Sequence, residues 1–232
     1  MTAVADPLQQ LAGLFAGNGA DADPGGPAGR ARHMLQAAAL AEAAGAPPAL
    51  VAAALLHDCG HFAVTVNDGV TVTDRRAVND GVPANDRGAT DGRGPGPGAD
   101  DGHAAAGARW LSRWFGEQVT EPVRLHVAAK RYLCAVEPGY LGDLPAAGRA
   151  TLAAQGGPMD DAEAAEFEAH PLACDALRLR RWDDAARDPA ASPPAFGYYR
   201  PLLRRLLRPR LLSPGKQPAV PAGLLTPPPR PE

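Results

Sequence analysis

The sequence predicts an all-α protein, folded as a single helical bundle. Two observations support this fold class. Segments rich in Ala and Leu repeat their apolar residues at intervals of three and four, the spacing of one helix face. Gly and Pro, which number 26 and 25 among 232 residues, gather instead in the segments 17–29, 81–102 and 213–231. Helices therefore alternate with segments whose composition is typical of loops and tails.

A chain of 232 residues suits one core of ordinary size. We expect an N-terminal helix and a Gly/Pro-rich link over residues 1–29, followed by the helical domain over residues 30–212. A mobile insertion is expected at 64–102, because its only sizeable apolar residues are valines, with a brief strand-like stretch at Val64 to Val72. Residues 213–232 are expected to form a disordered, proline-rich tail.

Helix start and stop residues bound the first helices. Asp and Pro side by side are a good start, because Asp caps the free backbone N–H groups and Pro fits the first turn. Gly after an apolar periodic run is a good stop. The first three predicted helices run from Asp6-Pro7 to Gly17, from Arg30 to Ala44 before Gly45, and from Pro47-Pro48 into His57-Asp58.

The same reasoning places the later helices. One predicted face carries Val123, His126, Lys130 and Leu133, at offsets of three, four and three. The later predicted helices run from His103 to Phe115 before Gly116, from Thr120-Glu121-Pro122 through Leu133, from Pro145 to Ala154, from Asp160 to Ala169, from Pro171 to Ala186 and from Phe196 to Leu207.

Charge and composition argue against several classes of function. The formal net charge is −3 and the basic residues form no long cluster, so nucleic acid is not the expected partner. No apolar run reaches the roughly 20 residues that cross a bilayer, and the first residues do not resemble a secretory signal. We expect a cytoplasmic protein. Its three cysteines, without a C-x-x-C pair, indicate neither a disulfide framework nor a thiolate metal site.

The sharpest local motif is His57-Asp58, at the end of an apolar helix and followed within two residues by Gly60. Neighbouring residues on a helix point about 100° apart, so this pair can meet at metal ions only near the helix end. A carboxylate has two oxygens and can bridge two ions, whereas an imidazole nitrogen serves one. Asp58 is thus the natural bridging ligand. The ordinary alternative is a buried histidine without a ligand role.

Other polar residues fall on predicted apolar helix faces. Asp183 continues the stripe of Leu172, Ala176 and Leu179, where metal coordination would offset the cost of burying a carboxylate. An ion pair with Arg180 or a surface position is the alternative. Lys130 follows His126 by one turn and is either an anion-binding cation beside the metals or a surface lysine.

The order of these residues resembles the HD superfamily, and specifically its mixed-valent di-iron oxygenase branch, the oxygenases of phosphonate breakdown that cleave the carbon–phosphorus bond of 2-amino-1-hydroxyethylphosphonate. The resemblance covers roughly residues 30–207 apart from the insertion. The strings that carry it are His57-Asp58-Cys59-Gly60-His61, His126-Val127-Ala128-Ala129-Lys130-Arg131-Tyr132-Leu133, Gln155-Gly156-Gly157-Pro158-Met159 and Arg181-Trp182-Asp183.

The resemblance implies two iron ions, an Fe(II)/Fe(III) pair, with O2 as co-substrate and a small organophosphonate as substrate. It implies that Asp58, His103 and His126 also carry the catalytic reaction, because they hold the iron that is open to substrate and dioxygen. By resemblance, one iron is held by His33, His57, Asp58 and Asp183, the other by Asp58, His103 and His126, and the phosphonate contacts His61, Lys130 and Thr151.

The chain departs from this family's pattern at two places. A Tyr and a Glu are expected upstream of His33, the Glu to receive a substrate amine, but residues 23–32 contain neither. A serine expected to touch the phosphonate is replaced by Gly148. The resemblance therefore predicts cleavage of a 1-hydroxyphosphonate, which need not carry a primary amine, to phosphate and a carboxylic acid. The alternatives are a metal-dependent HD phosphohydrolase acting on a phosphate ester and an HD protein that keeps its metals without catalysis.

Overall fold

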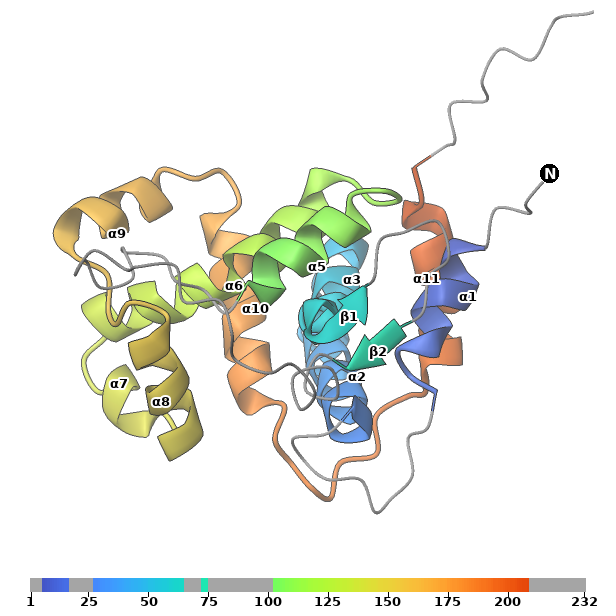
Figure 1. Ribbon diagram of the computed structural model, residues 1–232, viewed down its shortest axis with the longest axis horizontal. Coiled ribbons are helices and arrows are strands. Elements are labelled where there is room, and N and C mark those ends of the chain that lie inside the picture. Colours follow the sequence, from blue (N-terminus) through green and yellow to red (C-terminus); the bar gives the residue numbers. More distant parts are fainter. Residues whose placement is uncertain (1–5, 17–26, 65–71, 75–101, 209–232) are drawn as a thin grey trace, which may run out of the picture.

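The structure is a computed structural model, and it describes four stretches of the chain: residues 6–16, 27–64, 72–74 and 102–208 (Figure 1). Most of the predicted insertion and the whole predicted tail therefore lie outside the described residues. Strand β1 (Phe62–Val64) pairs antiparallel with strand β2 (Val72–Asp74). The sequence predicts a brief strand-like stretch from Val64 to Val72, and the two described strands lie at the two ends of that stretch.

The described residues are otherwise helical, as the sequence predicts. The helices are α1 (Pro7–Gly13), α2 (Pro27–Ala43), α3 (Pro48–Leu56), the 3-10 turn η1 (Cys59–His61), α5 (His103–Leu111), α6 (Glu117–Val136), α7 (Tyr140–Asp143), α8 (Ala146–Ala154), α9 (Asp161–Glu168), α10 (Ala173–Ala185) and α11 (Phe196–Leu206). Most of the predicted helices appear within a few residues of their expected bounds, and the short α7 was not predicted.

Three predicted boundaries are wrong. Helix α1 ends at Gly13 instead of Gly17, and α5 ends at Leu111 instead of Phe115. Helix α6 begins at Glu117 and carries Pro122 in its interior, where the sequence predicts Pro122 at the start. An interior proline removes one backbone hydrogen bond. The helix nevertheless continues through it, because Pro122 and its apolar neighbours are buried against the bundle.

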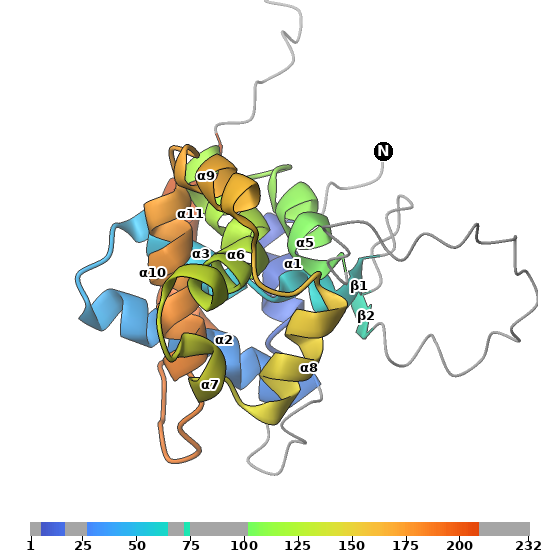
Figure 2. The same cartoon turned by 90° about the vertical axis from the view of Figure 1, so that its left-hand side faces the viewer.

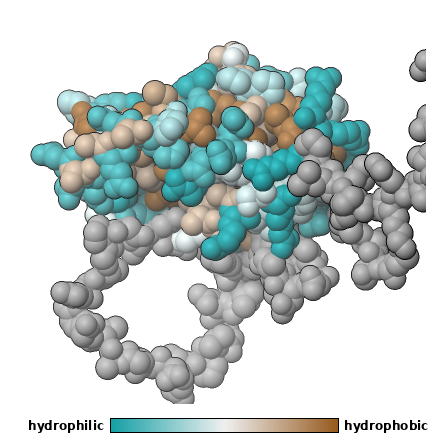
Figure 3. All heavy atoms as spheres, turned by 90° about the horizontal axis from the view of Figure 1, so that it is seen from above, coloured by the Kyte–Doolittle hydropathy of each residue, from teal (hydrophilic) through white to brown (hydrophobic). Residues whose placement is uncertain are grey.

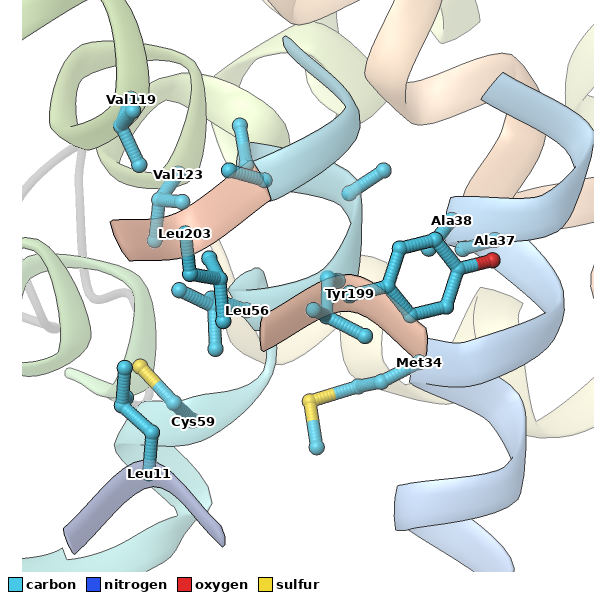
Figure 4. Packing of buried hydrophobic residues seen from close by; sticks show 14 of the residues in the cluster. Leu11, Met34, Ala37, Ala38, Leu56, Cys59, Val119, Val123, Tyr199 and Leu203 are labelled. Atoms are coloured by element: carbon cyan, nitrogen blue, oxygen red, sulfur yellow. The ribbon is translucent and has the colours of Figure 1, made fainter. Parts of the chain in front are cut away.

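The main core surrounds α3, whose residues 50–56 are all buried. A helix that is apolar all round must be covered on every side, and α2, α6, α10 and α11 pack against it. Figure 4 shows Leu56 of α3 beside Leu203 of α11 and Val123 of α6. This burial fixes the C-terminal end of α3, and with it the position of the His57-Asp58 pair.

Helices α7, α8 and α9 form a side layer, which faces the viewer in Figure 2. Two small clusters attach it to the bundle, one between α6, α9 and α10 that includes Phe167, and one between α6, α7 and α8 that includes Leu152. The guanidinium of Arg131 on α6 also holds this layer, because it donates to both carboxylate oxygens of Glu163 at 2.9 and 2.8 Å and to the carbonyl of Gly157 at 2.9 Å.

Polar side chains of α2 fasten the segment that follows α10. Gln36 does so with both ends of its amide: its Nε2 donates to the carbonyl of Asp188 at 2.9 Å, and its Oε1 accepts from the backbone N–H of Asp188 at 3.2 Å. The other contacts are made by Arg32, which donates to the carbonyls of Pro189 and Ala191, and by His33, whose Nδ1 donates to the carbonyl of Ala186. These hydrogen bonds fix α2 relative to the end of α10.

We expect Gln36→Ala to lower the free energy of unfolding by about 1–2 kcal/mol, because the buried amide loses two hydrogen bonds to Asp188. Urea denaturation measures the change. Gln118→Ala, on an exposed helix position, is the matched control and should stay within about 0.5 kcal/mol of the parent protein. Equal effects of the two substitutions would show that the hydrogen bonds between Gln36 and Asp188 do not stabilise the fold.

Hydrophilic residues cover most of the described surface in the view of Figure 3, with hydrophobic ones interspersed. Among the described helices, none combines the length and the apolar character that crossing a bilayer requires.

Candidate metal centre

His33 and Asp183 meet although 150 residues separate them in the chain. His33 lies in α2 and Asp183 in the last turns of α10, two helices that pack against each other. The Nε2 atom of His33 lies 3.0 Å from Oδ1 of Asp183. The predicted stripe on α10 is buried at Ala176, Leu179 and Asp183, so Asp183 does project from the apolar face toward the bundle interior.

His57 and Asp58 lie where α3 ends and the 3-10 turn η1 begins. The Oδ1 atom of Asp58 is the centre of the arrangement, because four histidine nitrogens surround it. Its distances to the Nε2 atoms are 3.6 Å for His57, 3.8 Å for His61, 3.5 Å for His103 and 3.8 Å for His126.

His103 opens α5, and His126 lies near the middle of α6. These two helices pack against each other and bring the Nε2 atoms of the two histidines to 3.0 Å. The structure thus brings all six predicted metal ligands together from five elements of the fold, α2, the end of α3, α5, α6 and α10, whose arrangement Figure 1 shows. His57, His103, His126 and Asp183 are buried, while His33 and Asp58 are partly exposed.

Backbone carbonyls orient three of these imidazole rings. A carbonyl oxygen only accepts, so the Nδ1 atom that meets it carries the ring proton and Nε2 keeps a lone pair in the neutral ring. The distances from Nδ1 to the carbonyl oxygen are 2.8 Å for His33 with Ala186, 2.8 Å for His57 with Ala54 and 2.7 Å for His126 with Val123. This is the tautomer and the outer support that metal-binding histidines need.

The lone pairs so directed face other acceptors, which is unfavourable unless a proton or a metal ion lies between the two atoms. Nε2 of His33 faces a carboxylate oxygen at 3.0 Å, and Nε2 of His57 is buried without a hydrogen-bond partner among the described residues. Two donors about 2.1 Å from one ion and about 90° apart are about 3 Å from each other. The contacts of 3.0 Å match that spacing, so the residues present fit bound metal ions.

Two groups of ligand atoms are compact enough to hold one ion each. His33, His57 and Asp58 offer atoms within 4.8 Å of one another, and so do Asp58, His61 and His103. Asp58 belongs to both groups. The geometry therefore allows two adjacent ions that share this carboxylate.

The electrostatics of the centre also favour a cation. Burial lowers the pKa of His57, but the carboxylates of Asp58 and Asp183 outweigh it and raise the pKa to about 9. Burial, together with the positive charge of His103 and His57, lowers the pKa of His126 to about 3. Without a metal, the centre would thus hold a proton on His57 and leave His126 neutral, ready to bind an ion.

Arg180 supports Asp183 from the far side. Its Nη1 lies 2.7 Å from Oδ2 of Asp183, while Oδ1 faces the histidines, and its Nε donates to Asp184 at 3.0 Å. Burial raises the pKa of Asp183, but the charges of Arg180 and His57 hold it well below its usual range. The sequence offers the ion pair and metal coordination as alternatives, whereas the geometry accommodates both, one on each oxygen. The spacing of three on α10 is the sequence signal for this pair.

The residues expected to touch a phosphonate lie in two places. His61 is at the metal centre, 3.8 Å from Asp58. The ammonium of Lys130 is one turn beyond His126 on α6 and donates to the hydroxyl of Thr151 on α8 at 3.1 Å. Thr151 in turn donates to the carbonyl of Gly148 at 2.9 Å. A buried cation and a hydroxyl thus meet between the bundle and the side layer.

No family model matches the chain, but it is similar to other known proteins. It is 35% identical over 200 residues, 86% of this chain and 90% of the relative, to 1-hydroxy-2-(trimethylamino)ethylphosphonate dioxygenase (glycine-betaine-forming) of Leisingera caerulea. It is 41% identical over 155 residues, 67% of this chain and 66% of the relative, to hydroxymethylphosphonate dioxygenase of Gimesia maris. An uncharacterized protein of Acanthamoeba polyphaga mimivirus is 30% identical over 171 residues, 74% of this chain and 68% of the relative. These similarities and the His/Asp centre show that the chain belongs to the family of HD-domain phosphonate dioxygenases.

Proposed function

We propose that this protein holds two iron ions, as a mixed-valent Fe(II)/Fe(III) pair, and uses O2 to cleave the carbon–phosphorus bond of a 1-hydroxyphosphonate. His33, His57, Asp58 and Asp183 would hold one iron, and Asp58, His103 and His126 would hold the other. The observation that carries the proposal is the position of Asp58, whose Oδ1 lies within 3.5 to 3.8 Å of histidine nitrogens on both sides. From this position Asp58 could bridge both ions, and the chain is related to dioxygenases.

The reaction balances with one O2 per substrate. The C–P bond breaks, the carbon that bears the hydroxyl is oxidised to a carboxylate, and O2 is reduced as its two atoms enter the products. R–CH(OH)–PO3²⁻ and O2 give R–COO⁻, HPO4²⁻ and a proton. When bound, the iron pair supplies the electrons that activate O2 and the Lewis acidity that orients the hydroxyl and phosphonate oxygens.

The protein itself binds and positions the substrate. Lys130 is a buried cation held beside the Thr151 hydroxyl, which can turn its hydrogen from the Gly148 carbonyl to an arriving anion, and this pair suits the dianionic phosphonate. The carbonyl-bound Nδ1 atoms keep the imidazoles of His57 and His126 in the tautomer that points Nε2 inward. Arg180 keeps Oδ2 of Asp183 engaged, so that this carboxylate offers its other oxygen.

The substrate is expected to lack a primary amine. Both dioxygenase relatives are named for phosphonates with a hydroxyl on the carbon that bears phosphorus, and neither name specifies a primary amine. This agrees with the absence of a Glu from residues 23–32. We therefore expect hydroxymethylphosphonate and other 1-hydroxyphosphonates without an amine to be better substrates than 2-amino-1-hydroxyethylphosphonate.

The test is phosphate release by anaerobically purified, iron-loaded protein, with and without O2. A panel of hydroxymethylphosphonate, 1-hydroxyethylphosphonate and 2-amino-1-hydroxyethylphosphonate is compared with methyl phosphate as the phosphate ester. We expect release only with O2, at one O2 consumed per phosphate. Release from methyl phosphate without O2 would instead identify a phosphohydrolase.

Lys130→Met should raise KM for the phosphonate roughly 10- to 100-fold, because a charge-assisted hydrogen bond of about 1.5–3 kcal/mol is lost. Methionine keeps the length and packing of the buried side chain. Arg124→Met, which removes an exposed positive charge from the same helix, is the control and should leave KM unchanged. Steady-state kinetics at saturating O2 measures both, and an unchanged KM in Lys130→Met would argue against this anion site.

A further inference from the structure

His61 lies beside Asp58 and His103, two of the residues proposed to hold the second iron. We propose that His61 is a ligand of the second iron in the substrate-free protein, and that the arriving phosphonate displaces it. The inference rests on the proposed function, since it needs a second metal and a phosphonate substrate. It gives His61 a role before substrate binds, in addition to the phosphonate contact that the sequence predicts.

The local fold places His61 and Asp58 on the same side of the chain. His61 ends the 3-10 turn η1, and its backbone N–H donates to the carbonyl of Asp58 at 3.0 Å. Residues three apart in a 3-10 turn eclipse each other, so their side chains point the same way. The result is the distance of 3.8 Å between Nε2 of His61 and Oδ1 of Asp58.

His103 approaches the same point from α5. Its Nε2 lies 3.5 Å from Oδ1 of Asp58, and its ring stacks on that of His61 with centroids 3.9 Å apart and planes at 16°. The ligand atoms of Asp58, His61 and His103 accordingly lie within 4.8 Å of one another, the span of one coordination sphere.

Exposure indicates which of these ligands can leave. The His61 side chain is 29% exposed, whereas those of His103 and His126 are 6% and 2% exposed. His103 and His126 are held inside two packed helices, but His61 sits at the end of a short turn. A substrate that enters from solvent meets His61 first and can replace it without disturbing the helices.

The experiment compares the parent protein, loaded with two irons without O2, with His61→Ala and with His61→Gln, which preserves side-chain bulk. The control is His170→Ala, because His170 is also 29% exposed and pairs with Glu121 at 3.5 Å outside the centre. The readouts are the rate at which a chelator removes iron and the EPR spectrum of the mixed-valent pair. Both are recorded with and without hydroxymethylphosphonate.

Without substrate, we expect both His61 variants to lose one iron at least about 10-fold faster than the parent and to show an altered spectrum. Free imidazole should slow the loss from His61→Ala. With hydroxymethylphosphonate bound, the spectra of variants and parent should converge, because the substrate has displaced His61. A parent-like spectrum and parent-like iron loss, with only a raised KM, would overturn the proposal and leave His61 as a substrate contact alone.

The result is separable from a failure of the proposed function. A parent protein that holds two irons but releases phosphate without O2 would disprove the oxygenase reaction, while the iron-loss rates would still decide the ligand role of His61. A parent protein that binds a single metal would overturn the His61 proposal directly.

Discussion

Asp58→Asn is expected to abolish the second metal site and to lower the rate of O2-dependent phosphate release by about a thousand-fold or more. The bridging role of Asp58 gives this substitution the largest expected effect on activity. Asparagine keeps the size of the side chain but has no negative charge and only one acceptor oxygen. It cannot bridge two cations, and several kcal/mol of metal-derived stabilisation correspond to about a thousand-fold in rate.

The surroundings of Asp58 explain why no neighbour can replace it. Burial raises its pKa, but the charges of His57 and His61 lead the interactions that lower it far below the usual range, so the carboxylate stays ionised. The other carboxylate among the predicted ligands, Asp183, lies 3.0 Å from His33 and is engaged by Arg180. Asp58 is thus the anion that faces both metal positions.

The control for this experiment is Asp175→Asn, the same chemical change on a partly exposed residue of α10 that lies 3.5 Å from Arg178. It should keep two metals and the parent rate. Metal content is measured by elemental analysis on protein whose helical circular dichroism matches the parent, which separates loss of binding from loss of folding. Two metals and a near-parental rate in Asp58→Asn would refute the bridging role.

Local signals in the sequence predict most of the helices. Asp6 and Pro7 start α1 as expected, with the Asp6 carboxylate accepting from the N–H of Leu8, and Asp160 caps α9 together with Glu163. These signals depend only on neighbouring residues. The start of α6 was predicted wrongly because Pro122 is a strong local signal that packing overrides, and packing depends on distant parts of the chain.

The candidate metal centre likewise has features that the sequence predicts and features that it does not. The expectation that His57 and Asp58 converge only at a helix end follows from helix geometry, and the structure places them there. The carbonyls that orient His57 and His126 lie three residues earlier on the same helices, but the support of His33 could not be predicted, since it is a backbone carbonyl far away in sequence. His33 meets the carbonyl of Ala186 across 153 residues, and Gln36 meets Asp188 across 152. A side chain that binds a backbone group leaves no residue pattern at the other end.

Gly60→Ala should have the largest expected effect on stability, a loss of about 3 kcal/mol or more in the free energy of unfolding, together with loss of the second metal. A Cβ atom at Gly60 would lie 1.9 Å from the carbonyl oxygen of His103 and 2.8 Å from the backbone nitrogen of Gly107. Overpacking usually costs about 1–3 kcal/mol when side chains can move, and more when they cannot. Here the obstacle is the backbone of α5, so η1 and α5 must separate.

That separation would pull the metal ligands apart, because η1 follows Asp58 and ends with His61, while His103 opens α5.

Gly107→Ala is a comparison with a smaller expected effect. Its Cβ would lie 3.1 Å from both the Cys59 sulfur and the backbone nitrogen of Gly60, so a smaller shift suffices. Gly197→Ala is the control, since a Cβ there meets nothing within 4 Å inside α11, and it should stabilise the protein by about 0.5–1 kcal/mol. Urea denaturation and metal analysis should therefore rank the three variants in the order Gly197, Gly107, Gly60. A Gly60→Ala protein with parental stability and two metals would mean that η1 and α5 do not pack at backbone distance, and that the short contacts around Asp58 do not depend on this interface.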